Sequence, residues 1–99
     1  MRVISRKTLR DFWEVQHHAD AEAPLSAWFV EAEKAGWATL AAVKAQYASA
    51  SVLKDGRVVF NIGGNKYCLV VRIRFDKRIA FIRFVGTRRE YDEIDVQTI

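Results

Sequence analysis

The sequence predicts an α+β fold, with two or three N-terminal helices packed on one face of a small antiparallel sheet. Apolar residues recur at helical spacing in the first half of the chain and alternate along the strand-like stretch from Val58 to Gly86. Two turn signals, Gly63-Gly64 and Asp76-Lys77, divide that stretch into three strands. With 99 residues, 51% of them apolar, the chain can build one core, so we expect a single domain over residues 1–99.

The first two helices have clear boundary signals. Ser5 is a good N-cap, and the apolar spacing after it predicts a helix that runs to about His17. The segment Asp20–Pro24 combines acidic residues with a proline, which is typical of a helix start, and Gly36 marks the expected stop of this second helix. His17 and His18 are therefore expected at the end of the first helix or in the loop after it, as surface residues.

Shorter elements flank these helices and the strands. Thr39 is the expected cap of a third helix, and Asp55-Gly56 is the expected turn into the sheet. Arg2–Ile4 has the length of a short strand at the sheet edge, and the residues around Tyr91 are expected to form a short C-terminal helix. The helices before the sheet are then free to cover one of its faces.

Strand alternation assigns each side chain of the sheet to one of two faces. With Gly63-Gly64 as a two-residue turn, Asn61 lies opposite Lys66, and Phe60 lies opposite Tyr67. One face is then apolar and must be covered, through Val58, Phe60, Ile62, Tyr67, Leu69, Val71, Ile73, Phe75, Ala80, Ile82 and Phe84. The other face is expected to stay open, and it collects Asn61, Lys66, Cys68, Arg72, Arg74 and Arg83.

The basic residues are concentrated in the sheet. The net charge of the whole chain is +4, but the segment from Arg57 to Arg89 holds nine basic residues and one acidic residue. A surface of one sign favours a polyanionic partner such as nucleic acid, although exposed strands also need charge for solvation.

Several function classes are excluded or disfavoured. No apolar run approaches the roughly 20 residues of a membrane span, and the N-terminus lacks the apolar core of a signal peptide, so we expect a cytoplasmic protein with no membrane partner. The single cysteine, Cys68, cannot form an internal disulfide, and with His17 and His18 it makes no recognisable metal site. The chain contains no phosphate-binding loop and no hydrolase motif, and we expect no metal and no cofactor.

The segment after the last strand carries the most informative polar residues. Arg88 and Arg89 follow the strand directly, and Tyr91 lies about one helical turn past Arg88. Arginines can clamp a phosphate and the charge that develops in a transition state, while a hydroxyl can move a proton. This combination indicates a phosphodiester site at the edge of the basic face.

Three stretches resemble one known family. They are Val59–Tyr67, Ile82–Thr87 and Glu90–Asp92, and the likeness extends to Met1–Ser5 and Asp20–Leu25. Together they are similar to HigB-type toxins of the RelE/ParE superfamily from bacterial toxin–antitoxin modules. The resemblance implies a ribosome-associated mRNA endonuclease in a hetero-oligomeric complex with a HigA-like antitoxin that carries a helix-turn-helix domain.

The resemblance also implies the roles of individual residues. The positions that match the family pattern are Asn61, Asn65, Lys66, Arg83, Thr87 and Tyr91, while Cys68 stands where the family usually has arginine and Arg88 where it usually has histidine. The expected chemistry is attack of the ribose 2′-hydroxyl on phosphorus without a metal, and we assign catalytic roles to Arg88, Tyr91, Lys66 and Arg83. Substrate binding is assigned to Asn61, Asn65, Arg72, Arg74, Thr87 and Arg89.

Three functional hypotheses remain open at this point. The first is the RNA-cleaving toxin, in which Arg88 stabilises charge, Tyr91 acts as an acid and Lys66 is another proton-transfer candidate. The second is a toxin-fold binder without nuclease activity, with ParE-like gyrase inhibition as the precedent, and the third is a basic RNA-binding domain. In each toxin reading the antitoxin is expected on the basic face, beside exposed apolar residues that include Val59, Val70, Ile79 and Phe81.

Overall fold

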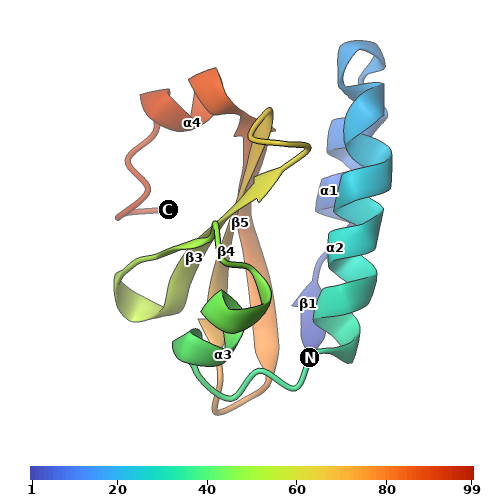
Figure 1. Ribbon diagram of the computed structural model, residues 1–99. Helices are drawn as coiled ribbons and strands as arrows, with labels where there is room; N and C mark the ends of the chain where they lie inside the picture. The colour runs from blue at the N-terminus through green and yellow to red at the C-terminus, as the bar shows by residue number, and fades with distance from the viewer.

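The computed structural model describes residues 1–99, apart from the side chain of Gln16, and within that part of the chain five strands form one sheet in the order β1-β5-β4-β3-β2. Helices α1 and α2 lie side by side along one face of the sheet, and α4 stands at the opposite side (Figure 1). In chain order the elements are β1 Arg2–Ile4, α1 Arg6–Trp13, the 3-10 helix η1 Gln16–Ala21, α2 Glu22–Lys34, α3 Leu40–Gln46, β2 Ser51–Val52, the 3-10 turn η2 Lys54–Gly56, β3 Arg57–Ile62, β4 Tyr67–Arg74, β5 Ile79–Thr87 and α4 Arg88–Glu93. The predicted α+β class is confirmed.

The N-terminal helices follow the sequence signals with two corrections. Ser5 stands at the N-cap position of α1, but its side chain makes no capping hydrogen bond. Helix α1 ends at Trp13 and not near His17, because the backbone becomes extended at Val15 before η1 begins. His18 lies in η1 with its ring stacked on Phe12, at a centroid distance of 4.2 Å. The expected cap of α3 is present, since the Thr39 hydroxyl accepts a hydrogen bond from the Ala42 backbone N–H at 3.2 Å.

The core lies between the helices and the predicted apolar face of the sheet. Trp28 of α2 and Trp37 of the α2–α3 loop both pack against Phe60 of β3, with ring centroids 5.3 Å and 6.2 Å away. Tyr67 and Leu69 of β4 join the same cluster and are almost fully buried. The expectation that the helices cover this face is therefore confirmed, and burial of large aromatic surfaces is a main source of stability here.

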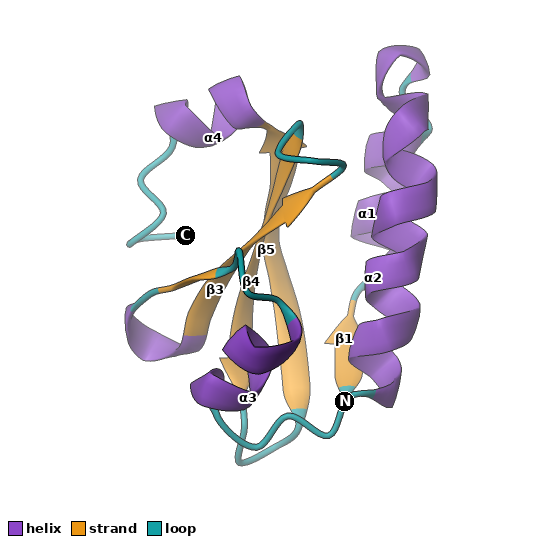
Figure 2. Ribbon diagram, viewed as in Figure 1, coloured by secondary structure: helices purple, strands orange, loops and turns teal.

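The sheet is mixed, and not purely antiparallel as expected. Strand β1 forms the predicted edge strand, but it runs parallel to β5, with Val3 beside Ala80 (Figure 2). At the other edge, β2 pairs antiparallel with β3 at only two positions, Val58 and Val59. The remainder of β3 toward Ile62 therefore has a neighbouring strand on its β4 side alone, within the described part of the chain.

The β3–β4 turn has four residues, so the predicted pairing of Asn61 with Lys66 is wrong. Asn61 lies opposite Cys68, and Ile62 lies opposite Tyr67. The turn is longer because Gly63, Gly64 and also Asn65 all have positive φ, whereas a two-residue primed turn needs only two such residues. The shift moves each partner by two positions, and therefore every side chain keeps its predicted face.

A β-bulge in β5 corrects the expected position of Phe84. Val70 pairs with Phe84 and Val71 with Ile82, which leaves Arg83 as the extra residue. A bulge reverses the alternation that follows it. Phe84 therefore leaves the core side and packs against Val70 on the other face.

That second face is only partly open, which is a further correction. The segment after α4 folds back over it, and Val96 and Ile99 pack on a small cluster formed by Val59, Cys68 and Val70. Beneath the same segment, the Nε of the buried Arg57 donates a hydrogen bond to the backbone O of Ile99 at 3.0 Å. Val59 and Val70 are buried by the chain itself. The expectation that they are exposed contacts for the antitoxin is therefore wrong.

No helix in the described part of the chain combines the length and the apolar character that a membrane crossing requires.

Candidate functional site

The start of α4 is fixed by two sets of hydrogen bonds. The Thr87 hydroxyl accepts from the Glu90 backbone N–H at 3.1 Å, and a Glu90 carboxylate oxygen accepts from the Thr87 backbone N–H at 2.8 Å. This reciprocal pair is a capping box, and the hydrogen bond from Thr87 holds the pKa of Glu90 below its ordinary value. The Arg88 backbone N–H also donates to the Lys66 carbonyl at 3.3 Å, which joins α4 to the β3–β4 turn.

The side chain of Arg88 is the centre of a cluster drawn from three elements. Its Nη1 lies 3.3 Å from Asn61 Oδ1 on β3 and 3.8 Å from Cys68 Sγ on β4, and the guanidinium carbon lies 5.7 Å from the centre of the Tyr91 ring on α4. None of the ion pairs among the described residues involves Arg88. The cluster, named here the Arg88 cluster, therefore presents a positive charge that is held in place by neutral groups.

Cys68 contributes to this cluster as a neutral thiol. Burial raises the pKa of Cys68, and the opposing effect of the Arg88 guanidinium is smaller. A thiolate is the nucleophilic form of cysteine. At neutral pH Cys68 is thus a hydrogen-bond acceptor for Arg88, and the site gives no support for thiolate catalysis.

The side chain of Lys66 is held by η1 and not by the Arg88 cluster. Its Nζ donates a hydrogen bond to the carboxylate of Asp20 in η1, and the Tyr67 hydroxyl donates to the same carboxylate. These two donors lower the pKa of Asp20, and the bond to Asp20 raises the pKa of Lys66. Lys66 is consequently a cation at neutral pH. Asp20 was not predicted as a site residue, because the sequence marked it only as part of an acidic helix start.

Arg83, to which a catalytic role was also assigned, lines a separate hollow and is not among the contacts of the Arg88 side chain. The bulge places Arg83 with Arg72, Arg74 and Phe81 around a hollow of about 140 Å³. On β4 this hollow begins four residues from Cys68, which corresponds to about 13 Å along the strand. The predicted site is thus divided into the Arg88 cluster and an arginine hollow on the same face of the sheet.

The remaining predicted residues belong to the β3–β4 turn, the end of β5 and the start of α4. Asn65 is exposed in the β3–β4 turn with a φ of 75°, and Arg89 is exposed on α4. The Thr87 hydroxyl is used in the capping box. Among the described residues, no group of three or more His, Cys, Asp or Glu side chains is close enough to hold a metal ion.

The helices on one face of a five-stranded mixed sheet are consistent with a compact RelE-like fold. Over residues 21–94 the sequence matches the family described as HigB_toxin, the RelE-like toxic component of a toxin-antitoxin system. It is also 30% identical over 94 residues to the mRNA interferase toxin HigB of Escherichia coli K12, and equally to the mRNA interferase HigB of Escherichia coli O157:H7 and of Shigella flexneri. Each match covers 93% of this chain and 88% of the relative.

The chain therefore belongs to the HigB toxin family. Membership in a toxin–antitoxin family implies an antitoxin as its partner.

Proposed function

We propose that this chain is an endoribonuclease that cleaves mRNA on the ribosome and is neutralised by a HigA-like antitoxin with a helix-turn-helix domain. The observation that carries the proposal is the Arg88 cluster, in which one arginine is oriented by Asn61 and lies beside the Tyr91 ring. The relatives named mRNA interferases support the same reading.

The proposed reaction is an internal transesterification. The ribose 2′-oxygen attacks the adjacent phosphorus while its proton leaves to a base, the bond from phosphorus to the 5′-oxygen breaks, and that oxygen takes a proton from an acid. The products are a 2′,3′-cyclic phosphate and a 5′-hydroxyl. This route needs groups that stabilise negative charge on the equatorial oxygens and groups that transfer two protons.

Arg88 suits the first requirement. Its guanidinium stays protonated at any ordinary pH, so it stabilises the developing charge but does not act as a base. Asn61 accepts from one Nη atom, which leaves other N–H groups of Arg88 free to donate to phosphate oxygens. Tyr91 is the candidate acid for the leaving oxygen. In this mechanism Lys66 contributes its positive charge to the site after its side chain leaves Asp20 on RNA binding.

The arginine hollow suits the neighbouring part of the RNA strand. Arg83 carries no ion pair among the described residues, while Arg72 donates to the Asp55 carbonyl and Arg74 to the Asp76 carboxylate, so these last two are already oriented. The three arginines can bind phosphates, and Phe81 can stack on a base. In the proposal, Asn65, Thr87 and Arg89 contact the RNA strand at the end of β4 that lies away from the hollow, beside the Arg88 cluster.

The test is induced expression in a bacterial host, with growth and the 5′ ends of mRNA measured together. Arg88→Ala is expected to reduce cleavage by about 10²- to 10³-fold, and Tyr91→Phe to reduce it strongly, with both variants still folded. Arg10→Ala is the matched control, because Arg10 is an exposed arginine on α1. Native cleavage by both site variants would refute the assignment of the Arg88 cluster.

One observation favours a second candidate function, a toxin-fold binder without nuclease activity. Lys66 and Arg88 are both cations at neutral pH, and the thiol of Cys68 is neutral, so none of these three provides a ready base for the 2′-hydroxyl. This candidate predicts growth arrest with intact mRNA and an arrest that Tyr91→Phe leaves unchanged.

A further inference from the structure

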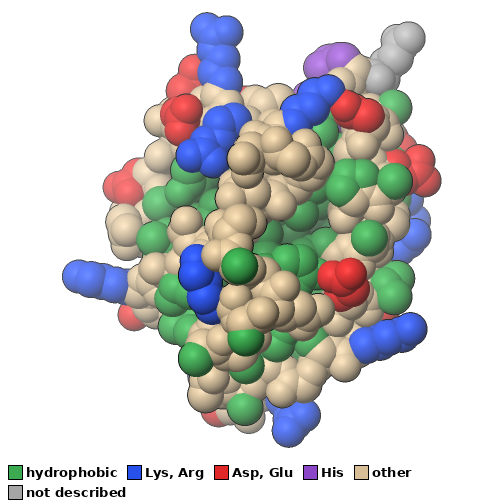
Figure 3. All heavy atoms as spheres, in the orientation of Figure 1, with side chains coloured by type: hydrophobic (Ala, Val, Ile, Leu, Met, Phe, Trp, Pro, Cys, Tyr) green, Lys and Arg blue, Asp and Glu red, His purple; other side chains and the backbone are tan. Residues whose placement is uncertain are grey.

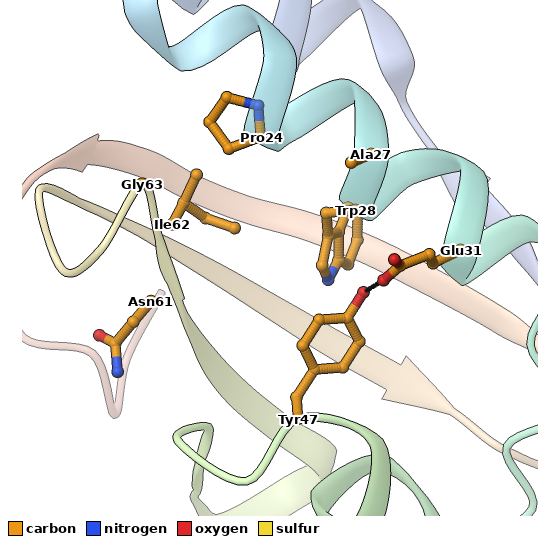
Figure 4. A pocket seen from close by; sticks show the side chains of 8 residues that line it. All are labelled: Pro24, Ala27, Trp28, Glu31, Tyr47, Asn61, Ile62 and Gly63. Atoms are coloured by element: carbon orange, nitrogen blue, oxygen red, sulfur yellow. Dashed lines mark hydrogen bonds between the residues drawn. The ribbon is translucent and has the colours of Figure 1, made fainter.

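A groove lies on the helix side of the molecule, between α2, the end of α3 and the end of β3 (Figure 4). Its volume is about 240 Å³, and its apolar walls come from Pro24, Ala27 and Ile62. In Figure 3, apolar side chains are visible between α2 and the end of α3, while Lys and Arg side chains lie at the outline of the molecule and at a few places within the visible face. This groove plays no part in the proposed cleavage.

The groove contains a buried hydrogen-bond donor that is not used. The indole Nε1 of Trp28 has no acceptor among the described residues, although the side chain is only 2% exposed. Figure 4 shows this nitrogen pointing toward the side of the groove where Tyr47 lies. Buried N–H groups in folded proteins are almost always paired, so this donor indicates a bound group that carries an acceptor.

The groove also carries one charge. Among the described lining residues, Glu31 is the only ionisable carboxylate, and it accepts a hydrogen bond from the Tyr47 hydroxyl. Burial, followed by the nearby Glu31, raises the pKa of Tyr47, which therefore remains a donor at neutral pH. A carboxylate has several lone pairs, so Glu31 can accept a further bond from a cation. The groove is thus acidic, in contrast to the basic sheet.

The strand beside the groove lacks a paired strand on one side of its end. Because β2 pairs with β3 only at Val58 and Val59, the end of β3 at Asn61 and Ile62 has no strand on that side within the described chain. The contact there is a side-chain one, since Asn61 Nδ2 donates a hydrogen bond to the Ser49 backbone O at 3.1 Å. An exposed strand edge can accept an extended peptide through backbone hydrogen bonds. A peptide backbone also supplies carbonyl acceptors of the kind that Trp28 Nε1 lacks.

We propose that this groove binds an extended segment of the antitoxin, with a backbone carbonyl on Trp28 Nε1 and a lysine or arginine side chain on Glu31. The proposal rests on the antitoxin partnership described above and is independent of RNA cleavage. Asn61 borders the groove, but its side chain lies on the opposite face of β3, where its Oδ1 accepts the hydrogen bond from Arg88, so the groove and the Arg88 cluster are separate surfaces.

The test compares two variants with the same change in charge. Glu31→Lys alters the groove, whereas Glu33→Lys alters an exposed residue of the same helix that does not line it. Affinity for the purified full-length cognate antitoxin is measured without RNA, after circular dichroism has confirmed that both variants are folded. We expect Glu31→Lys to weaken binding by about tenfold or more and Glu33→Lys by less than about twofold.

A second measurement follows the indole N–H signals of the toxin by NMR during titration with the antitoxin. The Trp28 signal is expected to move downfield, while that of Trp37, which already donates to Gln46 at 2.9 Å, stays in place. Equal affinities for the two variants would overturn the proposal. So would a Trp28 signal that moves no more than that of Trp37, as expected for a groove that holds only water. Neither measurement involves cleavage, so a failure of the proposed nuclease function would be seen separately.

Discussion

Replacing Thr87 by alanine removes the side-chain half of the capping box that orders α4. The Glu90 backbone N–H then loses its acceptor at 3.1 Å, while the bond from the Thr87 backbone N–H to the Glu90 carboxylate can persist. Loss of a threonine N-cap costs about 1 kcal/mol, which corresponds to about a fivefold change in an equilibrium constant. None of the described side chains of α4 is fully buried, so this cost acts first on local opening of the helix.

Hydrogen exchange of the free protein measures this effect directly. Amide protection in α4 should fall about fivefold in Thr87→Ala, and the global free energy of unfolding should fall by no more than about 1 kcal/mol. Thr87→Ser keeps the hydroxyl and should behave like the native chain. Equal exchange rates in the alanine and serine variants would refute the capping argument. A loss of cleavage much greater than about fivefold in Thr87→Ala would instead indicate that the hydroxyl contacts RNA.

Two further predictions concern the turns and the acid limb of stability. Gly56→Ala should lower the free energy of unfolding in urea by more than about 2 kcal/mol, because the φ of Gly56 is +75° and a Cβ would lie 2.5 Å from the Ile73 carbonyl oxygen. Gly36 has an ordinary φ and open space around it, so Gly36→Ala should change this free energy by less than about 1 kcal/mol. Equal effects of the two substitutions would contradict the argument from backbone strain. The lowered pKa of Asp20 means that its contribution to stability is present above the ordinary carboxyl pKa of about 4 and is lost as the pH falls through the folded-state value. In Asp20→Asn, the free energy of unfolding should therefore fall less steeply below about pH 4 than in the native chain. An unchanged pH dependence in this range would show that Asp20 does not cause the loss of stability in acid.

Much of the fold could be predicted because local signals and tertiary packing agree. The cap at Thr39 depends only on neighbouring residues, and the division of the strands into an apolar and a basic face follows from alternation. The four-residue turn preserved that division because it shifted the pairing by an even number of positions. The family resemblance was carried by short motifs on β3, β5 and α4, and the match over residues 21–94 confirmed it.

The rest depends on contacts that alternation and spacing do not encode. A single extra residue, Arg83, reversed the side of Phe84, and nothing in the sequence marks where such a bulge falls. The bond between Asp20 and Lys66 joins η1 to a distant turn and draws the lysine from its expected position. Burial of Val59 and Val70 depends on how the segment after α4 folds back.

The parallel pairing of β1 with β5 affects the order in which the protein can fold. Val3 and Ala80 lie at opposite ends of the sequence, so this pair closes a loop that contains both long helices and three of the other strands. Contacts between residues so far apart in sequence form slowly, because the chain loses the entropy of loop closure before the contact adds any stability. During synthesis, β1 has no strand partner until β5 has left the ribosome, and Arg88 follows β5 directly. Arg88 therefore joins Asn61 and Cys68 only after nearly all of these elements have been made, so the nascent chain cannot assemble the Arg88 cluster early.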